Sequence, residues 1–89
     1  MISVNGYDIN FKLDTGSDVN IMPKSQLNTW ASQPVYKPTA ARVTTYTGQQ
    51  LPIEAECELH CSAGENECNL QFLVVSQPLK PILGANAHI

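Results

Sequence analysis

Asp14, Thr15 and Gly16 directly follow an apolar, strand-like segment, and apolar residues return a few positions later. A carboxylate among apolar residues is costly unless another group satisfies it or uses it. One such use is a pair of carboxyl groups about 3 Å apart, which share a single proton. The ionised member takes a proton from a water molecule, and the neutral member polarises a carbonyl oxygen. These three residues also form ordinary turns, so the triplet alone leaves both interpretations open.

The neighbours of Asp14 fit such a carboxylate pair. Gly16 lets two backbones approach closely, the Thr15 hydroxyl can brace the loop because it both donates and accepts, and the Ser17 hydroxyl is placed to hydrogen-bond a carboxylate. Because the chain holds one such triplet, the second carboxylate must come from a second copy on a two-fold axis. The sequence therefore predicts a homodimer, and a domain of 89 residues often needs a partner for stability as well.

The segment that leads into Asp14 has the pattern of a β-hairpin. Asn5 and Gly6 form a strong two-residue turn signal. After this turn, apolar and polar side chains alternate up to the triplet, which predicts a half-buried strand. The apolar face of this strand consists of Tyr7, Ile9, Phe11 and Leu13.

Strand patterns dominate the rest of the chain. Residues 23–38 hold three prolines and are loop-like, whereas residues 42–47 are rich in β-branched and aromatic residues. Strict alternation over residues 53–61, a turn and a further strand predict a second hairpin. A short apolar strand then ends at Gly84, with at most one short helix after it. Five or six short strands with little helix predict an all-β fold, a small closed barrel or sandwich.

The alternating strand over residues 53–61 carries a row of acidic side chains on one face. This row is either a solvated strand face or, if it borders a binding cleft, a selector for basic substrate residues. The row consists of Glu54, Glu56 and Glu58.

Cysteine and histidine residues on the same hairpin raise the question of a metal site. Cys57 and Cys61 are predicted to point inward while His60 points outward, and Cys68 follows on the next strand. This spacing matches no common structural zinc pattern, so we expect no metal and no cofactor. The odd number of cysteines is more typical of a reducing compartment than of a secreted disulfide framework.

Composition limits the classes of partner. Hydrophobic residues make up 43% of the chain and charged residues 15%, which is typical of a folded domain. A net charge of −3 without a basic stripe argues against a nucleic-acid partner. No apolar run is long enough to span a membrane and no signal peptide opens the chain, so we expect no membrane partner.

Three motifs together resemble the retropepsins, the aspartic proteases of retroviruses and LTR retrotransposons. LDTGSDVNIMP, residues 13–23, is similar to their catalytic loop, and PILGANA, residues 81–87, is similar to their late hydrophobic-hydrophobic-Gly strand. TTYTGQQLPI, residues 44–53, resembles their flap, a hairpin that closes over the substrate. The sequence of this segment resembles that of gypsy-type retrotransposon proteases in particular. The resemblance runs from about residue 7 to residue 87, and three motifs in the right order are far more specific than the triplet alone.

The resemblance implies a role for each matching residue. Asp14 supplies one half of a catalytic dyad, Thr15 hydrogen-bonds across the dimer axis, and Gly16 belongs to the catalytic loop along the bound peptide backbone. The flap residues close over the substrate, and no metal or covalent intermediate is needed. The substrate-binding set implied by the motifs is Ser17, Asp18, Tyr46, Thr47, Gly48, Gln49 and Ile82.

The sequence departs from the retropepsin pattern at two places. Many relatives have an Arg after the late glycine that pairs with an acid at the position of Asp18, whereas this chain has Ala85 there. Relatives also continue with a helix and a terminal strand that joins the two subunits, and this sequence ends at Ile89. The expectation is therefore a single retropepsin-like domain over residues 1–89, one half of a dimeric active site, without the C-terminal interface strand.

Two functions remain open from the sequence. The first is an aspartic endopeptidase that acts as a homodimer on extended peptides or a polyprotein, in the cytoplasm or inside a virus-like particle. The second is a catalytically silent, truncated or domesticated domain that serves as a peptide-binding or assembly module. An assay of peptide cleavage and a measurement of the molecular mass of the protein in solution distinguish the two functions.

Overall fold

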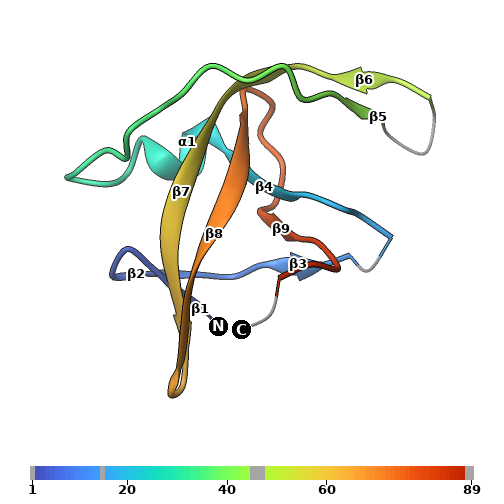
Figure 1. Cartoon of the computed structure of the whole chain (residues 1–89). Helices are drawn as coiled ribbons and strands as arrows, with labels where there is room; N and C mark the ends of the chain where they lie inside the picture. Colours follow the sequence, from blue (N-terminus) through green and yellow to red (C-terminus); the bar gives the residue numbers. More distant parts are fainter. Residues whose placement is uncertain (1, 15, 45–47, 88–89) are drawn as a thin grey trace.

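The fold is built almost entirely from short strands (Figure 1). The computed structural model describes residues 2–14, 16–44 and 48–87. Over these residues the elements are β1 (Ile2–Val4), β2 (Tyr7–Ile9), β3 (Lys12–Leu13), β4 (Asn20–Pro23), α1 (Lys24–Leu27), β5 (Val43–Thr44), β6 (Gln50–Leu51), β7 (Ile53–Ala63), β8 (Asn66–Val75) and β9 (Ile82–Leu83). The all-β class predicted from the sequence is confirmed. The described helix is a single turn that lies within the segment predicted to be a loop, and no helix follows Gly84 in the described residues.

The predicted turn at Asn5 and Gly6 closes the β1–β2 hairpin. Both residues have positive φ angles, 51° and 88°, which is the backbone of a type I′ turn. Val4 and Tyr7 face each other directly across the turn. The turn also docks on β7, because the Asn5 N–H donates to the His60 carbonyl at 2.8 Å and the His60 N–H donates to the Asn5 side-chain oxygen at 2.9 Å.

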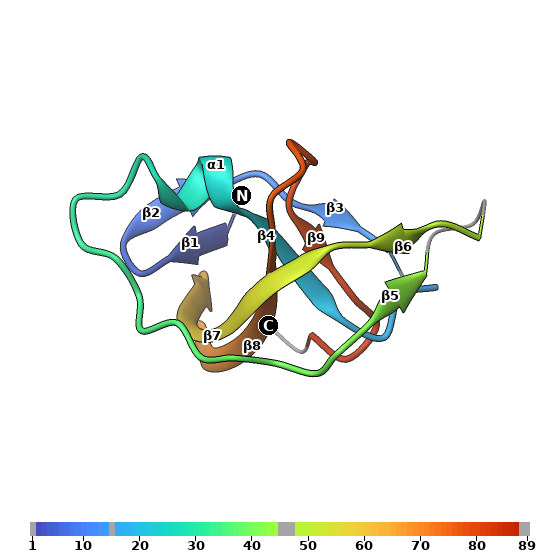
Figure 2. The ribbon, with the colours of Figure 1, turned by 90° about the horizontal axis from the view of Figure 1, so that it is seen from above.

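The main sheet has seven strands in the order β2-β1-β7-β8-β4-β9-β3 and curls into a half-barrel (Figure 2). The long β7–β8 hairpin forms its centre, with a register shift between Ile53 and Ala55 that bends the hairpin. The separate β5–β6 hairpin extends from one end of the molecule. In both ribbon views it lies at the same end as the loop that follows β3.

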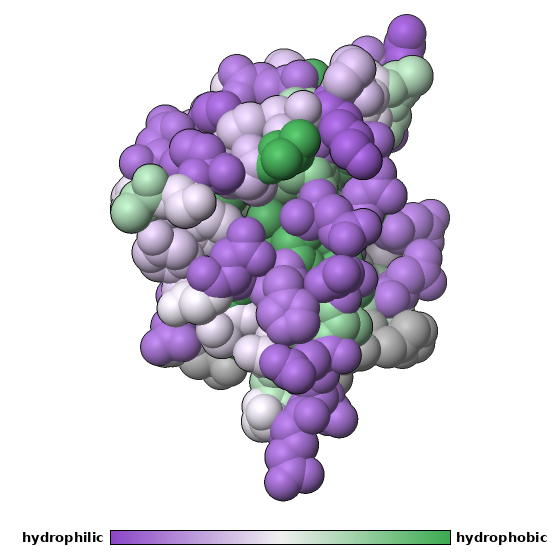
Figure 3. All heavy atoms as spheres, turned by 60° about the vertical axis from the view of Figure 1, so that its left-hand side comes forward, coloured by the Kyte–Doolittle hydropathy of each residue, from purple (hydrophilic) through white to green (hydrophobic). Residues whose placement is uncertain are grey.

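The core lies inside the curl of the sheet, and Figure 3 shows hydrophilic side chains over most of one outer face. A smaller apolar cluster of Ile21, Leu51 and Val75 lies where the β5–β6 hairpin meets the sheet. Among the described residues, no helix has the length and apolar character needed to cross a membrane. The main core cluster consists of Val4, Ile9, Met22, Leu27, Trp30, Cys57, Leu59, Cys61, Phe72, Val74 and Leu83.

The alternation predicted for β7 is confirmed. Cys57 and Cys61 are buried and His60 is exposed. Burial raises the pKa of each of these two thiols to about 11, so both remain protonated at neutral pH. Cys68 lies directly opposite Cys61 in the β7–β8 register, as two cysteines that flank a turn can.

The prediction that Leu13 belongs to a buried strand face is wrong. The chain leaves the strand at Asn10 and Phe11, so the alternation is broken before β3 begins. β3 lies at the edge of the sheet and pairs only with β9, and the Leu13 side chain is 73% exposed. A large apolar side chain therefore lies uncovered one residue before Asp14.

The contacts of His60 predict a pH dependence of the stability of the folded protein. Hydrogen bonds from its ring to Asn69 at 2.9 Å and to Glu67 at 3.3 Å raise its pKa above 6.5. The folded protein then holds this proton more tightly than the unfolded chain, so the stabilising contribution is complete below the unfolded pKa of about 6.5 and disappears as the pH rises through the folded value.

We expect the melting temperature of the wild type to fall more than that of His60→Gln between about pH 5 and about pH 8. Asn69→Ala, which removes the larger cause, should give an intermediate profile. Identical profiles for the wild type and His60→Gln would contradict this role.

Candidate active site

β9 runs between the two strands that flank the Asp14 loop. It pairs in parallel with β3, with Leu13 opposite Leu83, and antiparallel with β4, with Ile21 opposite Ile82. The loop of residues 14–19 joins β3 to β4 and therefore crosses over the end of β9. This crossing places Asp14 between the edge strand β3 and the buried strand β4.

Backbone hydrogen bonds fix this loop on the strand below it. The Asp14 N–H donates to the Leu83 carbonyl at 2.9 Å, and the Ala85 N–H donates to the Ser17 carbonyl at 2.8 Å. The two bonds lie on either side of Gly84. The loop is thus positioned by a segment almost 70 residues away in the sequence.

Gly84 is the point of closest approach between loop and strand. A Cβ atom at this position would lie 2.6 Å from the Val19 carbonyl oxygen, 2.7 Å from the Ser17 carbonyl oxygen and 3.0 Å from the Val19 nitrogen. All three atoms belong to the backbone, so no side chain can rotate away to make room. Only glycine lets β9 pass beneath the loop at this distance.

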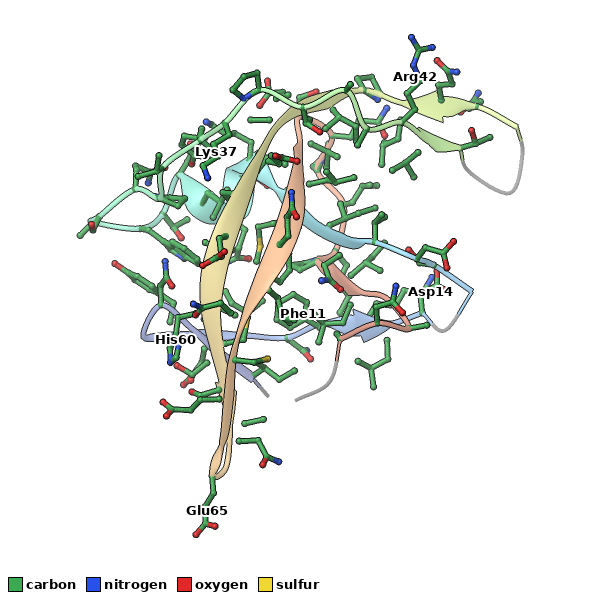
Figure 4. All side chains as sticks on the ribbon, viewed as in Figure 1. Phe11, Asp14, Lys37, Arg42, His60 and Glu65 are labelled. Atoms are coloured by element: carbon green, nitrogen blue, oxygen red, sulfur yellow. The ribbon has the colours of Figure 1, made fainter. Side chains whose placement is uncertain are left out.

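The Asp14 carboxyl group is half-buried and oriented by its own loop. The Gly16 N–H donates to its Oδ1 atom at 3.0 Å, and the Ser17 N–H donates to the Asp14 backbone carbonyl at 3.0 Å. Within the described residues, Oδ2 has no hydrogen-bond partner. Figure 4 shows Asp14 at the end of the molecule over which the β5–β6 hairpin extends. One carboxylate oxygen is therefore held in place, and no described residue occupies the other.

The predicted hydrogen bond from Ser17 to a carboxylate is not made among the described residues. The Ser17 hydroxyl donates its one proton to the Val19 carbonyl at 2.9 Å and accepts from the Val19 N–H at 3.3 Å. A local bond of this kind competes well because the partner lies only two residues away. The Ser17 hydroxyl therefore stabilises its own loop and does not bind a carboxylate of the described residues.

The other residues of the predicted site are distributed between the loop, β9 and the β5–β6 hairpin. Asp18 is exposed and makes no ion pair with any described residue, in keeping with the alanine at position 85. Ile82 is half-buried and packs on the smaller apolar cluster, while Gly48 and Gln49 are exposed next to β6. Thr15, Tyr46 and Thr47 lie outside the described residues.

Asn20 is a positioning residue that the sequence reasoning missed. Its Nδ2 atom donates to the Gln71 carbonyl of β8 at 3.1 Å, and its Oδ1 atom accepts from the Gly84 N–H at 2.9 Å. One side chain thus ties β8, the start of β4 and the end of β9 together. The available signal was a lone amide within the apolar segment from Val19 to Met22.

We expect Asn20→Ala to lower the free energy of unfolding by about 1–3 kcal/mol, because it leaves the partly buried Gly84 N–H unpaired. Asn10→Ala is the matched control, since Asn10 is exposed and makes no hydrogen bond with the described residues. Urea unfolding of both variants measures the difference. Equal midpoints for the two variants would show that Asn20 does not hold the loop.

Comparison with known proteins defines the class of this fold. Neither the protein-family models nor the curated protein sequences contain a match to the chain. Solved structures do match, and one of them is the EIAV protease in complex with the inhibitor HBY-793. The TM-score is 0.79 at 18% sequence identity, over 93% of this chain and 76% of that protease chain. The protein therefore has a retropepsin-like fold, as the motifs predicted.

Proposed function

We propose that the protein is an aspartic endopeptidase of retropepsin type that acts as a homodimer on extended peptides. The observation that carries this proposal is the position of Asp14, half-buried on a loop that β9 holds from below, with one carboxylate oxygen free of partners in the described chain. The likeness in fold to a retroviral protease supports it. In this proposal residues 1–89 form one domain that contributes half of an active site.

The chemistry requires two copies of Asp14. On a two-fold axis the two carboxyl groups meet and share one proton, because two negative charges about 3 Å apart are strongly disfavoured. The ionised carboxylate removes a proton from a water molecule, which attacks the peptide carbonyl carbon. The neutral carboxyl group donates a hydrogen bond to the carbonyl oxygen as negative charge develops on it. Thr15 braces the two loops across the axis.

Leu13 marks the surface that the second copy covers. Its exposed side chain lies next to Asp14, on β3 at the open edge of the sheet. An uncovered edge strand with a large apolar side chain readily pairs with another chain. Covering Leu13 by a second copy brings the two Asp14 loops together in the same step.

The substrate lies as an added strand between the β5–β6 hairpin and the loop of residues 14–19. Ser17 and Asp18 border the peptide from the loop, and Ile82 borders it from β9. The hairpin residues Tyr46, Thr47, Gly48 and Gln49 close over it from the other side. A polyprotein that contains this domain is the most natural substrate of this kind, inside a particle or in the cytoplasm.

We expect Leu13→Glu to convert a dimer into a monomer and to remove cleavage, because two charges would meet in the covered surface. The substituted position is exposed, so the monomer should keep its fold. Val35→Glu is the matched control: Val35 is 78% exposed and lies two residues before Lys37, which Figure 4 places on the other side of the molecule from Asp14. Sedimentation velocity measures both variants, and a dimeric Leu13→Glu protein would contradict the assigned surface.

Cleavage of an unbiased peptide mixture between about pH 4 and pH 7 tests the proposed activity. The expected result is cleavage that a statine-type transition-state analogue inhibits. A strict monomer at high micromolar concentration, without cleavage and without inhibitor binding, would instead select the peptide-binding or assembly module.

A further inference from the structure

We propose that a cavity beside the Asp14 loop binds a basic side chain of the substrate, with arginine preferred over neutral residues. This inference rests on the proposed peptidase function and deepens it by naming a specificity. The cavity has a volume of about 430 Å³ and extends from the loop at Asp18 to the outer face of the β7–β8 hairpin. Its volume falls in the usual range for small ligand groups, about 300–1,000 Å³.

The charge of the cavity is entirely negative. Asp18 and Glu56 line it, and no lysine, arginine or histidine of the described chain does. Lys37 hydrogen-bonds the Glu56 backbone in both directions at 2.9 Å, yet it neither lines the cavity nor forms an ion pair with the Glu56 carboxylate within the described residues. The two carboxylates therefore have no cationic partner among the described residues.

Three of the four amide side chains that line the cavity, those of Asn20, Gln71 and Asn86, place a donor nitrogen near an oxygen of another residue. The Nδ2 atom of Asn20 donates to the Gln71 carbonyl at 3.1 Å, and the Nε2 atom of Gln71 donates to Glu56 Oε2 at 2.6 Å. The Nδ2 atom of Asn86 lies 3.5 Å from the Asp18 carbonyl oxygen. Both carboxylates and the oxygens of Gln71 and Asn86 keep acceptor capacity. A ligand group with many hydrogen-bond donors therefore fits the lining of this cavity better than a group with many acceptors.

Both the guanidinium group and the apolar stem of an arginine side chain match this lining. Its guanidinium group carries five donors in a planar fork that can serve two separated acceptors, whereas a lysine ammonium is a compact point charge. The non-polar part of the lining, which includes Val19 and Leu73, suits the apolar stem of the side chain.

Glu56 differs from the other two members of the acidic row on β7. Glu54 and Glu58 are exposed, as expected for a solvated strand face, whereas Glu56 is half-buried and held by Gln71 at the cavity wall. Only the middle member of the row borders the cavity. Asp18, which the proposed function places along the bound peptide, lines the same cavity as Glu56. The cavity therefore adjoins the proposed path of an extended peptide.

The experiment compares peptides that differ at one position, arginine against citrulline, which has the same shape without the charge. With the dimeric wild type, we expect one position at which kcat/KM for arginine exceeds that for citrulline about ten-fold or more, as for a charge-assisted hydrogen bond. Glu56→Gln should bring this ratio close to one. Glu58→Gln, a matched change two residues along the same face, should leave the ratio unchanged.

Equal rates for arginine and citrulline at every position would overturn the inference while the peptidase function stands. An equal loss of selectivity in Glu58→Gln would also overturn it, because it would point to general surface charge. A binding measurement makes the outcome independent of activity. N-acetyl-argininamide, but not the citrulline analogue, should shift the backbone amide signals of Glu56 and Gln71 in the NMR spectrum, and no shift would overturn the inference even for an inactive protein.

Discussion

Asp14→Asn is expected to reduce peptide cleavage at least about a hundred-fold, the lower end of what general acid–base catalysis contributes. The amide has the shape of the carboxyl group and keeps an oxygen that can accept from the Gly16 N–H, so the loop should retain its geometry. What the variant loses is the ability to hold and release a proton between two copies. Cleavage of a fluorogenic peptide measures the effect.

Asp8→Asn is the matched control for this result. Asp8 is exposed on β2, at the opposite edge of the sheet from β3, and should tolerate the change without loss of cleavage. The thermal midpoint of Asp14→Asn should stay within a few degrees of the wild type. Retained cleavage in a folded Asp14→Asn protein would remove the proposed mechanism.

Gly84→Ala is expected to lower both the stability and the activity of the protein strongly. The new Cβ atom would meet the carbonyl oxygens of Val19 and Ser17 and the Val19 nitrogen, so either the loop or β9 must move. Overpacking costs about 1–3 kcal/mol, and rigid backbone neighbours favour the upper end of this range. Movement of the loop displaces Asp14, so cleavage should fall as well.

Gly64→Ala is the control that distinguishes the steric clash expected at Gly84 from the general cost of replacing a glycine. Gly64 lies in the turn of the β7–β8 hairpin with φ of 61°, and nothing lies within 4 Å of a Cβ atom built there. We expect this variant to lose about 1 kcal/mol through backbone strain alone and to keep its activity. Urea unfolding gives the stability of both variants, and equal costs would contradict the close approach assigned to Gly84.

Local sequence patterns are sufficient to predict the hairpins but not to predict the candidate active site. The Asn5-Gly6 turn and the alternation along β7 depend on neighbouring residues, and both were correctly predicted. The passage of β9 between β3 and β4 joins segments about 65 residues apart, and no periodicity encodes it. Only the resemblance to the retropepsin motifs indicated that the strand ending at Gly84 belongs to the same site as Asp14.

The individual errors have physical causes. Leu13 has the alternation of a core residue, but the edge position of β3 leaves it exposed, and an edge position depends on the whole sheet. Ser17 was assigned to a carboxylate, yet its hydroxyl finds a nearer partner in Val19. The sequence does not reveal the role of Asn20, because this role depends on two long-range hydrogen bonds, one to β8 and one to the end of β9.

A mixing experiment tests most directly whether the catalytic centre is built from two chains. Wild-type and Asp14→Asn chains are unfolded together in equal amounts, refolded, and assayed at a fixed total concentration. If each centre needs a carboxyl pair from two copies, random pairing leaves about one quarter of the wild-type activity. Activity of about one half would mean that each chain acts on its own, and it would contradict a dyad formed across a dimer.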